Sequence, residues 1–168
     1  AAALSTPFDL AACDRSLATG INRLYLPHFL PSLKVKLAHL AQRFPEVYER
    51  CDVPGAVRAE TCSAYDDVAT APLHGFASAG EYYRRSGAVG WVSRIETPTL
   101  CLNAEDDPFS PGDSLGPVRE EASASVELVI TATGGHVGFV TGRTPWSLRY
   151  WAEERALGWL ARRAGWPS

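Results

Sequence analysis

Apolar runs in the second half of the chain predict strands, and each of the two runs ends in residues that carry chemistry. The run 98–104 (PTLCLNA) is almost continuously apolar, which is typical of a strand buried on both faces. The run 126–130 (VELVI) alternates and predicts a second strand. Residues 1–4 indicate the tail of another buried strand. Ser5-Thr6-Pro7 ends it, because proline removes a donor from the ladder.

Helical spacing predicts that helices fill most of the remaining chain. In the clearest case, from about Pro31 to Phe44, apolar residues recur at i, i+4, i+7, i+8 and i+11, with Pro31 in the first turn. A second stripe predicts a closing helix that starts at Pro145, is capped by Thr144 and ends near Gly165. Shorter helices are predicted over 9–18, 79–85 and 116–123, and a loop with one helical piece over 47–65.

Composition narrows the class of protein. The chain has 168 residues, 46% of them hydrophobic and 21% charged, which fits one globular domain with a real core. A net charge of −3 with scattered Lys and Arg disfavours a nucleic-acid partner. No apolar run is long enough for a membrane span. The sequence does not determine the cellular compartment, although a cytoplasmic location is favoured.

The four cysteines show no metal-binding pattern. Cys13, Cys51, Cys62 and Cys101 have neither CxxC nor His-Cys spacing, and Cys101 lies inside a predicted buried strand. We interpret them as reduced thiols rather than as zinc ligands or disulfides. No cofactor is implied.

The candidate chemistry lies where the two strands end. The run 98–104 leads into Glu105-Asp106-Asp107, and the run 126–130 leads into a glycine loop that contains His136. Asp107 and His136 are 29 residues apart, enough for a loop, a helix and a strand, so a βαβ unit could bring them together. A carboxylate on one imidazole nitrogen fixes the tautomer and stabilises the imidazolium. The pair would form two thirds of a nucleophile, base and acid triad.

Other candidate sites are weaker. Ser114 lies in a G-x-S-x-G pattern, but prolines rather than a strand precede it, and it follows the acid in the chain instead of preceding it. Asp106, Asp107, Asp113 and His136 could hold a metal, yet they match no fixed ligand spacing. Turn or capping roles are expected for Asp66 and Asp67, a solvated position for His39 and a packed, hydrogen-bonded one for His74.

Several motifs in order along nearly the whole chain resemble one family. They are Ser5-Thr6-Pro7-Phe8-Asp9-Leu10, 29–34 (FLPSLK), Tyr65-Asp66-Asp67, 70–76 (TAPLHGF), Tyr82-Tyr83, Pro98-Thr99-Leu100, 103–108 (NAEDDP) and 134–139 (GGHVGF). Together they resemble the YheT-like branch of the α/β-hydrolases, also called family 4.

The resemblance implies a serine hydrolase of carboxylic esters, in some members lipids, with a Ser-Asp-His triad. The histidine would be His136. The acid would be Asp107 rather than Asp106, because the superfamily's acid is typically followed by three residues and a proline, here Pro111. The serine elbow and the oxyanion-hole loop would lie before Ala1. The expected substrate is a small-molecule or lipid ester.

The expected fold is α/β: the C-terminal half of an α/β-hydrolase, with a mainly parallel sheet and flanking helices. One partial domain would cover 1–168, with a helical cap over 11–89 and the last strands and both loops over 90–168. The alternative function is that of a non-catalytic fragment or degenerate hydrolase that acts as a binding module. Because the sheet would have an unpaired edge near 1–4, poor solubility of the isolated chain is expected.

Overall fold

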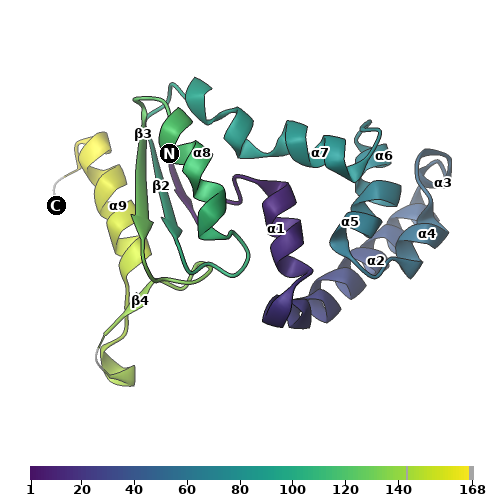
Figure 1. The fold of residues 1–168 in the computed structure, drawn as a ribbon, viewed down its shortest axis with the longest axis horizontal. Coiled ribbons are helices and arrows are strands. Elements are labelled where there is room, and N and C mark those ends of the chain that lie inside the picture. Colours follow the sequence, from purple (N-terminus) through teal and green to yellow (C-terminus); the bar gives the residue numbers. More distant parts are fainter. Residues whose placement is uncertain (143, 167–168) are drawn as a thin grey trace. The chain divides into compact units, whose positions relative to one another are not determined.

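The computed structural model of the chain describes residues 1–142 and 144–166. The chain divides into two compact units. The sheet unit comprises Ala1–Phe8 and Ala88–Ser168, and the helical unit comprises Asp9–Gly87 (Figure 1). The helical unit begins and ends within two residues of the range 11–89. Its role as a cap over a pocket stays a prediction.

The sheet has three parallel strands in the order β1-β2-β3, which are Ala2–Leu4, Thr99–Ala104 and Val126–Thr131 (Figure 1). The α/β class and the parallel sheet with flanking helices are therefore confirmed. Ala3 pairs with Cys101, and Cys101 pairs with Leu128. Because all strands run the same way, their carboxyl ends meet at one edge.

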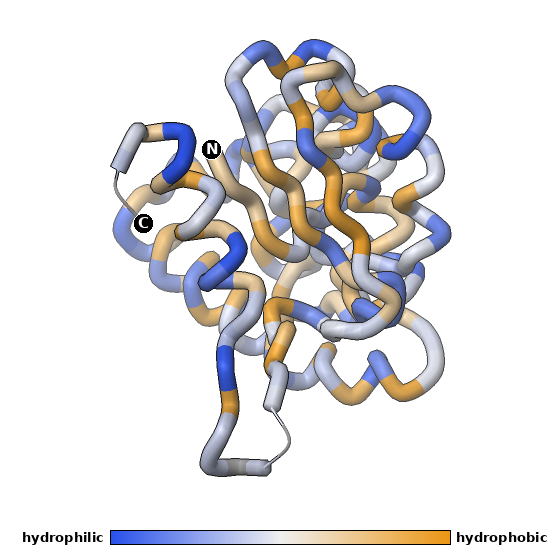
Figure 2. Tube along the Cα trace, turned by 90° about the vertical axis from the view of Figure 1, so that its left-hand side faces the viewer, coloured by the Kyte–Doolittle hydropathy of each residue, from blue (hydrophilic) through white to orange (hydrophobic). Residues whose placement is uncertain are grey.

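The central strand β2 forms the core of this unit, and all six of its residues are buried. Its side chains alternate between the faces, as the pleat requires. Cys101 contacts a cluster with Phe8, Leu115 and Val118, which includes helix α8 (Gly116–Glu121). Leu100 contacts Ala156 and Trp159 of helix α9 (Trp151–Ala164) on the other face. Figure 2 shows the strands as predominantly hydrophobic segments.

The predicted start of the closing helix is wrong. Pro145–Ser147 form a single 3-10 turn, in which Thr144 and Ser147 make a capping box. The chain then extends as β5 (Arg149–Tyr150), which pairs antiparallel with β4 (Val140–Thr141). The helix starts only at Trp151, whose N–H donates to the carbonyl of Phe139 at 3.1 Å. The predicted end is confirmed, because Gly165 is left-handed at φ 70°.

The helical unit contains more helix than the sequence predicted. It holds α1 (Leu10–Leu17), η1 (Gly20–Tyr25), α2 (Leu26–Arg43), α3 (Val47–Arg50), α4 (Val53–Arg58), α5 (Cys62–Tyr65), a π turn (Asp66–Thr70), α6 (Ala71–Leu73) and α7 (Ala79–Ser86). The sheet unit adds the 3-10 turns Ala88–Gly90, Val92–Arg94 and Gly112–Leu115. No described helix is both long and apolar enough to cross a bilayer.

Two helix predictions are corrected. Helix α2 begins at Leu26, with Pro27 in its first turn, so Pro31 lies inside the helix and removes one backbone donor. The segment predicted as a loop is helical because caps, rather than periodicity, set its short helices. The Asp52 side chain accepts from the N–H of Gly55, and that of Thr61 accepts from the N–H of Ala64.

A partly buried polar network joins the π turn to α7. Asp66 accepts hydrogen bonds from the hydroxyls of Tyr83 at 2.7 Å and Thr70 at 2.5 Å. Asp67 accepts from the N–H of Ala79 at 2.9 Å, which is a capping role of the kind expected. Burial, and then the hydrogen bond to Asp66, raise the pKa of Tyr83 far above its ordinary value. Tyr83 therefore stays protonated in the folded unit.

We expect Tyr83→Phe to lower the free energy of unfolding by about 1–3 kcal/mol at neutral pH, because it removes a donor from the partly buried carboxylate of Asp66. Above pH 10 the unfolded tyrosine ionises and the folded one does not, so stability falls as pH rises. Because phenylalanine does not ionise, the fall in the free energy of unfolding with pH should be shallower in the variant than in the wild type, by about 1.4 kcal/mol per pH unit. Urea titrations from pH 7 to 11 measure both effects, and the exposed Tyr48→Phe is the control. Equal slopes in Tyr83→Phe and wild type would contradict the raised pKa of Tyr83 in this network.

We also expect Leu100→Ala to cost about 2–5 kcal/mol, because Leu100 is fully buried between β2 and α9. Leu157→Ala on the solvent side of α9, where the side chain is 67% exposed, should cost less than about 0.5 kcal/mol. Chemical denaturation followed by circular dichroism compares the two. Similar losses in both variants would show that α9 does not cover the sheet.

Candidate active site

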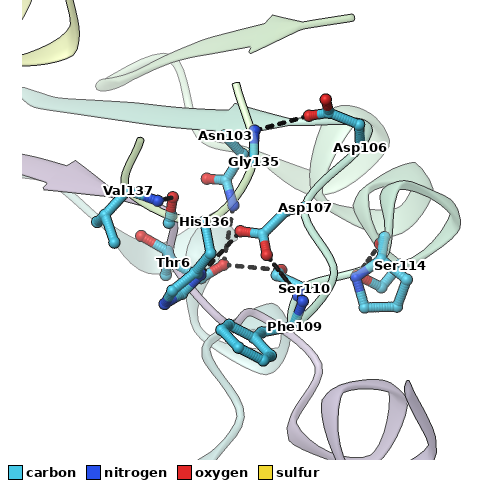
Figure 3. Close-up of polar contacts among 12 residues, drawn as sticks. Thr6, Asn103, Asp106, Asp107, Phe109, Ser110, Ser114, Gly135, His136 and Val137 are labelled. Atoms are coloured by element: carbon cyan, nitrogen blue, oxygen red, sulfur yellow. Dashed lines mark hydrogen bonds and ion pairs between the residues drawn. The ribbon is translucent and has the colours of Figure 1, made fainter. Parts of the chain in front are cut away.

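The candidate site lies at the carboxyl edge of the sheet, where β2 and β3 end together (Figure 3). Ala104 pairs with Thr131, and the N–H of Glu105 still donates to the Thr131 carbonyl at 2.8 Å. Beyond this point the two strands become the acidic loop and the histidine loop. The parallel register therefore starts both loops at the same level of the sheet.

The structure brings Asp107 and His136 into direct contact. Nδ1 of His136 lies 3.0 Å from Oδ2 of Asp107, whose side chain is wholly buried, whereas the His136 side chain is 34% exposed. The other oxygen of Asp107, Oδ1, accepts from the N–H groups of Phe109 at 2.8 Å and Ser110 at 3.1 Å. These bonds stabilise an ionised carboxylate, which can only accept hydrogen bonds. Nδ1 must then carry the proton.

The far nitrogen of the ring is left to act on a ligand. Among the described residues, no group hydrogen-bonds Nε2 of His136. With the proton on Nδ1, Nε2 of the neutral ring holds a lone pair and can accept a proton. The ring of Phe109 packs against the imidazole at 4.8 Å in an edge-to-face arrangement, which limits how the ring can tilt.

The histidine loop is held at three consecutive residues by three different side chains. Asp106 accepts from the N–H of Gly135 at 2.8 Å, Asp107 contacts His136, and the Ser5 hydroxyl accepts from the N–H of Val137 at 2.9 Å. Figure 3 shows these contacts converging on the loop. The loop's position is therefore fixed by residues from the ends of β1 and β2.

The glycines of this loop are required by its shape. Gly134 has no room for a side chain, because a Cβ there would lie 2.6 Å from the Phe139 ring. Gly135 has a φ of +60°, which favours glycine. Val137 and Ser5 adopt positive φ angles of 51° and 50° without that freedom. Such conformations cost of order 1–3 kcal/mol each and persist only when the surroundings impose them.

The backbone of Thr6, just past β1, supports the acidic loop through two hydrogen bonds. The carbonyl of Thr6 accepts from the amide of Asn103 at 3.0 Å and from the hydroxyl of Ser110 at 3.3 Å. Asn103 is fully buried, and its Oδ1 has no partner among the described residues. The chain just past β1 is thus tied to both β2 and the acidic loop.

The other candidates do not join the pair. Ser114 is buried in a 3-10 turn, where its hydroxyl donates to the carbonyl of Pro111 at 2.6 Å, and Figure 3 shows it turned away from His136. Asp106 contacts backbone rather than the imidazole. The described residues contain no group of three or more His, Cys, Asp or Glu that could hold a metal ion. His74 and His39 are exposed in the helical unit, so the packed position expected for His74 is wrong.

Three of the four cysteines, Cys51, Cys62 and Cys101, are poor nucleophiles. All four are free thiols, and three of them are buried. Burial raises the pKa of Cys51 and Cys101, and it raises the pKa of Cys62 to about 11. The reactive thiolate is therefore scarce at neutral pH.

Sequence reasoning missed Ser5, Asn103 and Ser110 as supports of the site. The one available signal was for Ser5, which follows a predicted strand directly and so lies at the sheet edge that carries the other loops.

A cavity of about 550 Å³ lies along the histidine loop, lined by Thr131, Gly134, Phe139, Thr141, Trp151 and neighbouring residues. Neither Asp107 nor His136 lines it.

Comparisons with known proteins give relatives over most of the chain. It is 34% identical over 157 residues to "Putative esterase YheT" of Escherichia coli, a match that covers 94% of this chain and 45% of that protein. It is 31% identical over 154 residues to mouse Phospholipase ABHD3, covering 89% of this chain and 36% of that protein. It is 31% identical over 163 residues to Monoacylglycerol lipase of Saccharomyces cerevisiae, covering 91% and 34%.

The chain thus spans less than half the length of each of these relatives. No protein-family model and no solved structure matches it.

The geometry predicts how His136 responds to two matched substitutions. In Asp107→Asn the amide oxygen must face the N–H groups of Phe109 and Ser110, so its NH₂ faces Nδ1. We expect the imidazole to switch from the Nδ1–H to the Nε2–H tautomer, as read by ¹⁵N NMR at mildly alkaline pH. Asp106→Asn should keep the Nδ1–H tautomer and instead speed hydrogen exchange at Gly135. If Asp106→Asn switched the tautomer and Asp107→Asn did not, Asp106 rather than Asp107 would be the partner of the imidazole.

Proposed function

This chain belongs to the YheT-like branch of the α/β-hydrolases, and from that membership we propose that it provides the acid and the base of a Ser-Asp-His triad for carboxylic ester hydrolysis. The observation that carries the proposal is the contact of His136 Nδ1 with the buried carboxylate of Asp107 at 3.0 Å. It supports an oriented imidazole with Nε2 available for proton transfer.

In the proposed reaction His136 acts twice. Nε2 first takes the proton of the serine hydroxyl as that oxygen attacks the ester carbonyl, and it then gives this proton to the leaving alcohol. A water molecule repeats the sequence on the acyl-enzyme. Asp107 stabilises the imidazolium formed in each half and does not itself take up the proton. Its two backbone hydrogen bonds keep it fixed throughout.

We propose that the attacking serine comes from outside the 168 residues. The hydroxyls of the three serines near the site contact backbone groups: Ser5 accepts from the N–H of Val137, Ser110 donates to the carbonyl of Thr6, and Ser114 donates to the carbonyl of Pro111. The relatives are more than twice as long as the aligned part of this chain. Among the described strands β1 pairs only with β2, which leaves an edge on which a further parallel strand could present a serine.

The proposed substrates are carboxylic esters, lipid esters included. The names of the relatives describe an esterase, a phospholipase and a monoacylglycerol lipase. The proposed triad chemistry suits carboxylic esters of different alcohols, because Nε2 of His136 can return its proton to any leaving alcohol.

The test compares Asp107→Asn with Asp106→Asn in a polypeptide that joins this chain to the segment preceding it in the gene. With a p-nitrophenyl ester, Asp107→Asn should lower kcat about 10³- to 10⁴-fold, because the wrong tautomer leaves Nε2 protonated. Asp106→Asn should change kcat by less than about tenfold, because it loosens only the loop anchor. Near-normal turnover in Asp107→Asn would refute the triad.

A fluorophosphonate probe on the 168-residue chain tests the origin of the serine. We expect no labelled serine in this chain and a labelled serine in the longer polypeptide. A label on Ser114 or Ser110, lost in His136→Ala, would place the nucleophile within these residues. No label in either polypeptide, with no ester turnover, would favour a non-catalytic binding module.

A further inference from the structure

Another cavity lies within the helical unit. This α2–α6 pocket measures about 330 Å³ and is enclosed between residues 33–40 of α2 and residues 65–74. All of its lining residues belong to the helical unit, so one compact unit forms the pocket (Figure 1). Its volume lies at the lower end of the range of small-molecule pockets.

One wall of the α2–α6 pocket is a single face of α2. Helical spacing at i, i+3, i+4 and i+7 brings four side chains to this face: Leu33, Lys36, Leu37 and Leu40. Leu37 is buried in the core of the unit, whereas Leu40 is 41% exposed. The wall therefore presents apolar side chains that the packing of the unit covers only in part, with one cation among them.

The facing wall comes from the end of α5, the π turn and α6. It consists of Tyr65, Thr70, Leu73 and His74. The hydroxyl of Tyr65 donates to the carbonyl of Leu33 at 3.3 Å and so ties this wall to α2. The hydroxyl of Thr70 donates to Asp66 at 2.5 Å, so its proton is not available to a ligand.

Two side chains at the α2–α6 pocket have donors that nothing in the described part of the chain uses. Lys36 forms no ion pair there, and the imidazole of His74 forms no hydrogen bond. Both side chains are exposed. An ammonium group donates up to three hydrogen bonds, and a neutral imidazole donates one. No Asp or Glu is among the described residues that line the pocket, so Lys36 gives it a positive character.

We propose that the α2–α6 pocket binds the anion of a fatty acid, with the acyl chain against the leucines and the carboxylate at Lys36 and His74. An apolar pocket with a few convergent polar groups is the usual form of a small-molecule site. The positive character of the pocket favours an anion over a neutral alcohol or a cation. Its volume suits a short acyl chain.

The carboxylate links this pocket to the proposed function. Hydrolysis of a carboxylic ester releases a carboxylic acid, which is ionised at neutral pH. The choice of a carboxylate over other anions rests on that proposed function, whereas the pocket and its unused donors do not. The helical unit would thereby retain the acyl product of the reaction.

The experiment is a titration of the 168-residue chain with octanoate, followed by the NMR signals of the imidazole side chains. The chain has four histidines, and we expect the signals of His74 to move while those of His28 and His39 stay in place. 1-Octanol should bind more weakly, because it carries no charge for Lys36. Acetate should bind at least about tenfold more weakly, because it lacks the apolar chain.

A charge reversal tests the role of Lys36. Lys36→Glu should lower the affinity for octanoate at least about tenfold and raise the affinity for octylammonium by a similar factor. The matched control is Lys34→Glu, which makes the same change on the same helix. Lys34 does not line the pocket, because a rotation of about 200° separates it from Lys36. This control should change both affinities by less than about twofold. Circular dichroism verifies the fold of each variant.

Several outcomes would overturn the proposal. Movement of the His136 signals in place of those of His74 would put the acid at the triad. Equal losses in Lys36→Glu and Lys34→Glu would show a general effect of charge, and equally tight binding of 1-octanol would show an apolar cavity without carboxylate recognition. Asp107→Asn should bind octanoate as the wild type does, so a failure of this pocket is separable from a failure of the triad.

Discussion

The buried carboxylate of Asp107 is the group on which the arrangement of the site depends. One of its oxygens is used entirely by the backbone of its own loop, and the other is directed at His136. A carboxylate in this position costs much free energy unless every contact is made, so the acidic loop and the histidine loop must form together. The register of β2 and β3 makes this feasible, because both loops begin at the same level of the sheet.

The supports of the pair come from three strand ends rather than from one motif. Ser5 at the end of β1 holds the residue after the histidine, and Asp106 holds the residue before it. The two positive φ angles at Ser5 and Val137 show that this contact is maintained against local preference. A scaffold that stores strain beside a titratable ring restricts the ring to one orientation, which is what a proton-transfer group requires.

The sequence by itself determined the three strands, the meeting of the acidic loop with the histidine loop and the family, because alternating or continuous apolar runs and ordered motifs are local signals. It misplaced the starts of the helices at Leu26 and Trp151 and missed the short helices of 47–65, since caps and a backbone bond to Phe139 decide them. Only the tertiary structure decided between the aspartates, because adjacent side chains diverge and only Oδ2 of Asp107 reaches the ring. It also decided the role of Ser5, because the sequence places this residue at the sheet edge but does not identify its partner Val137, which lies 132 residues away.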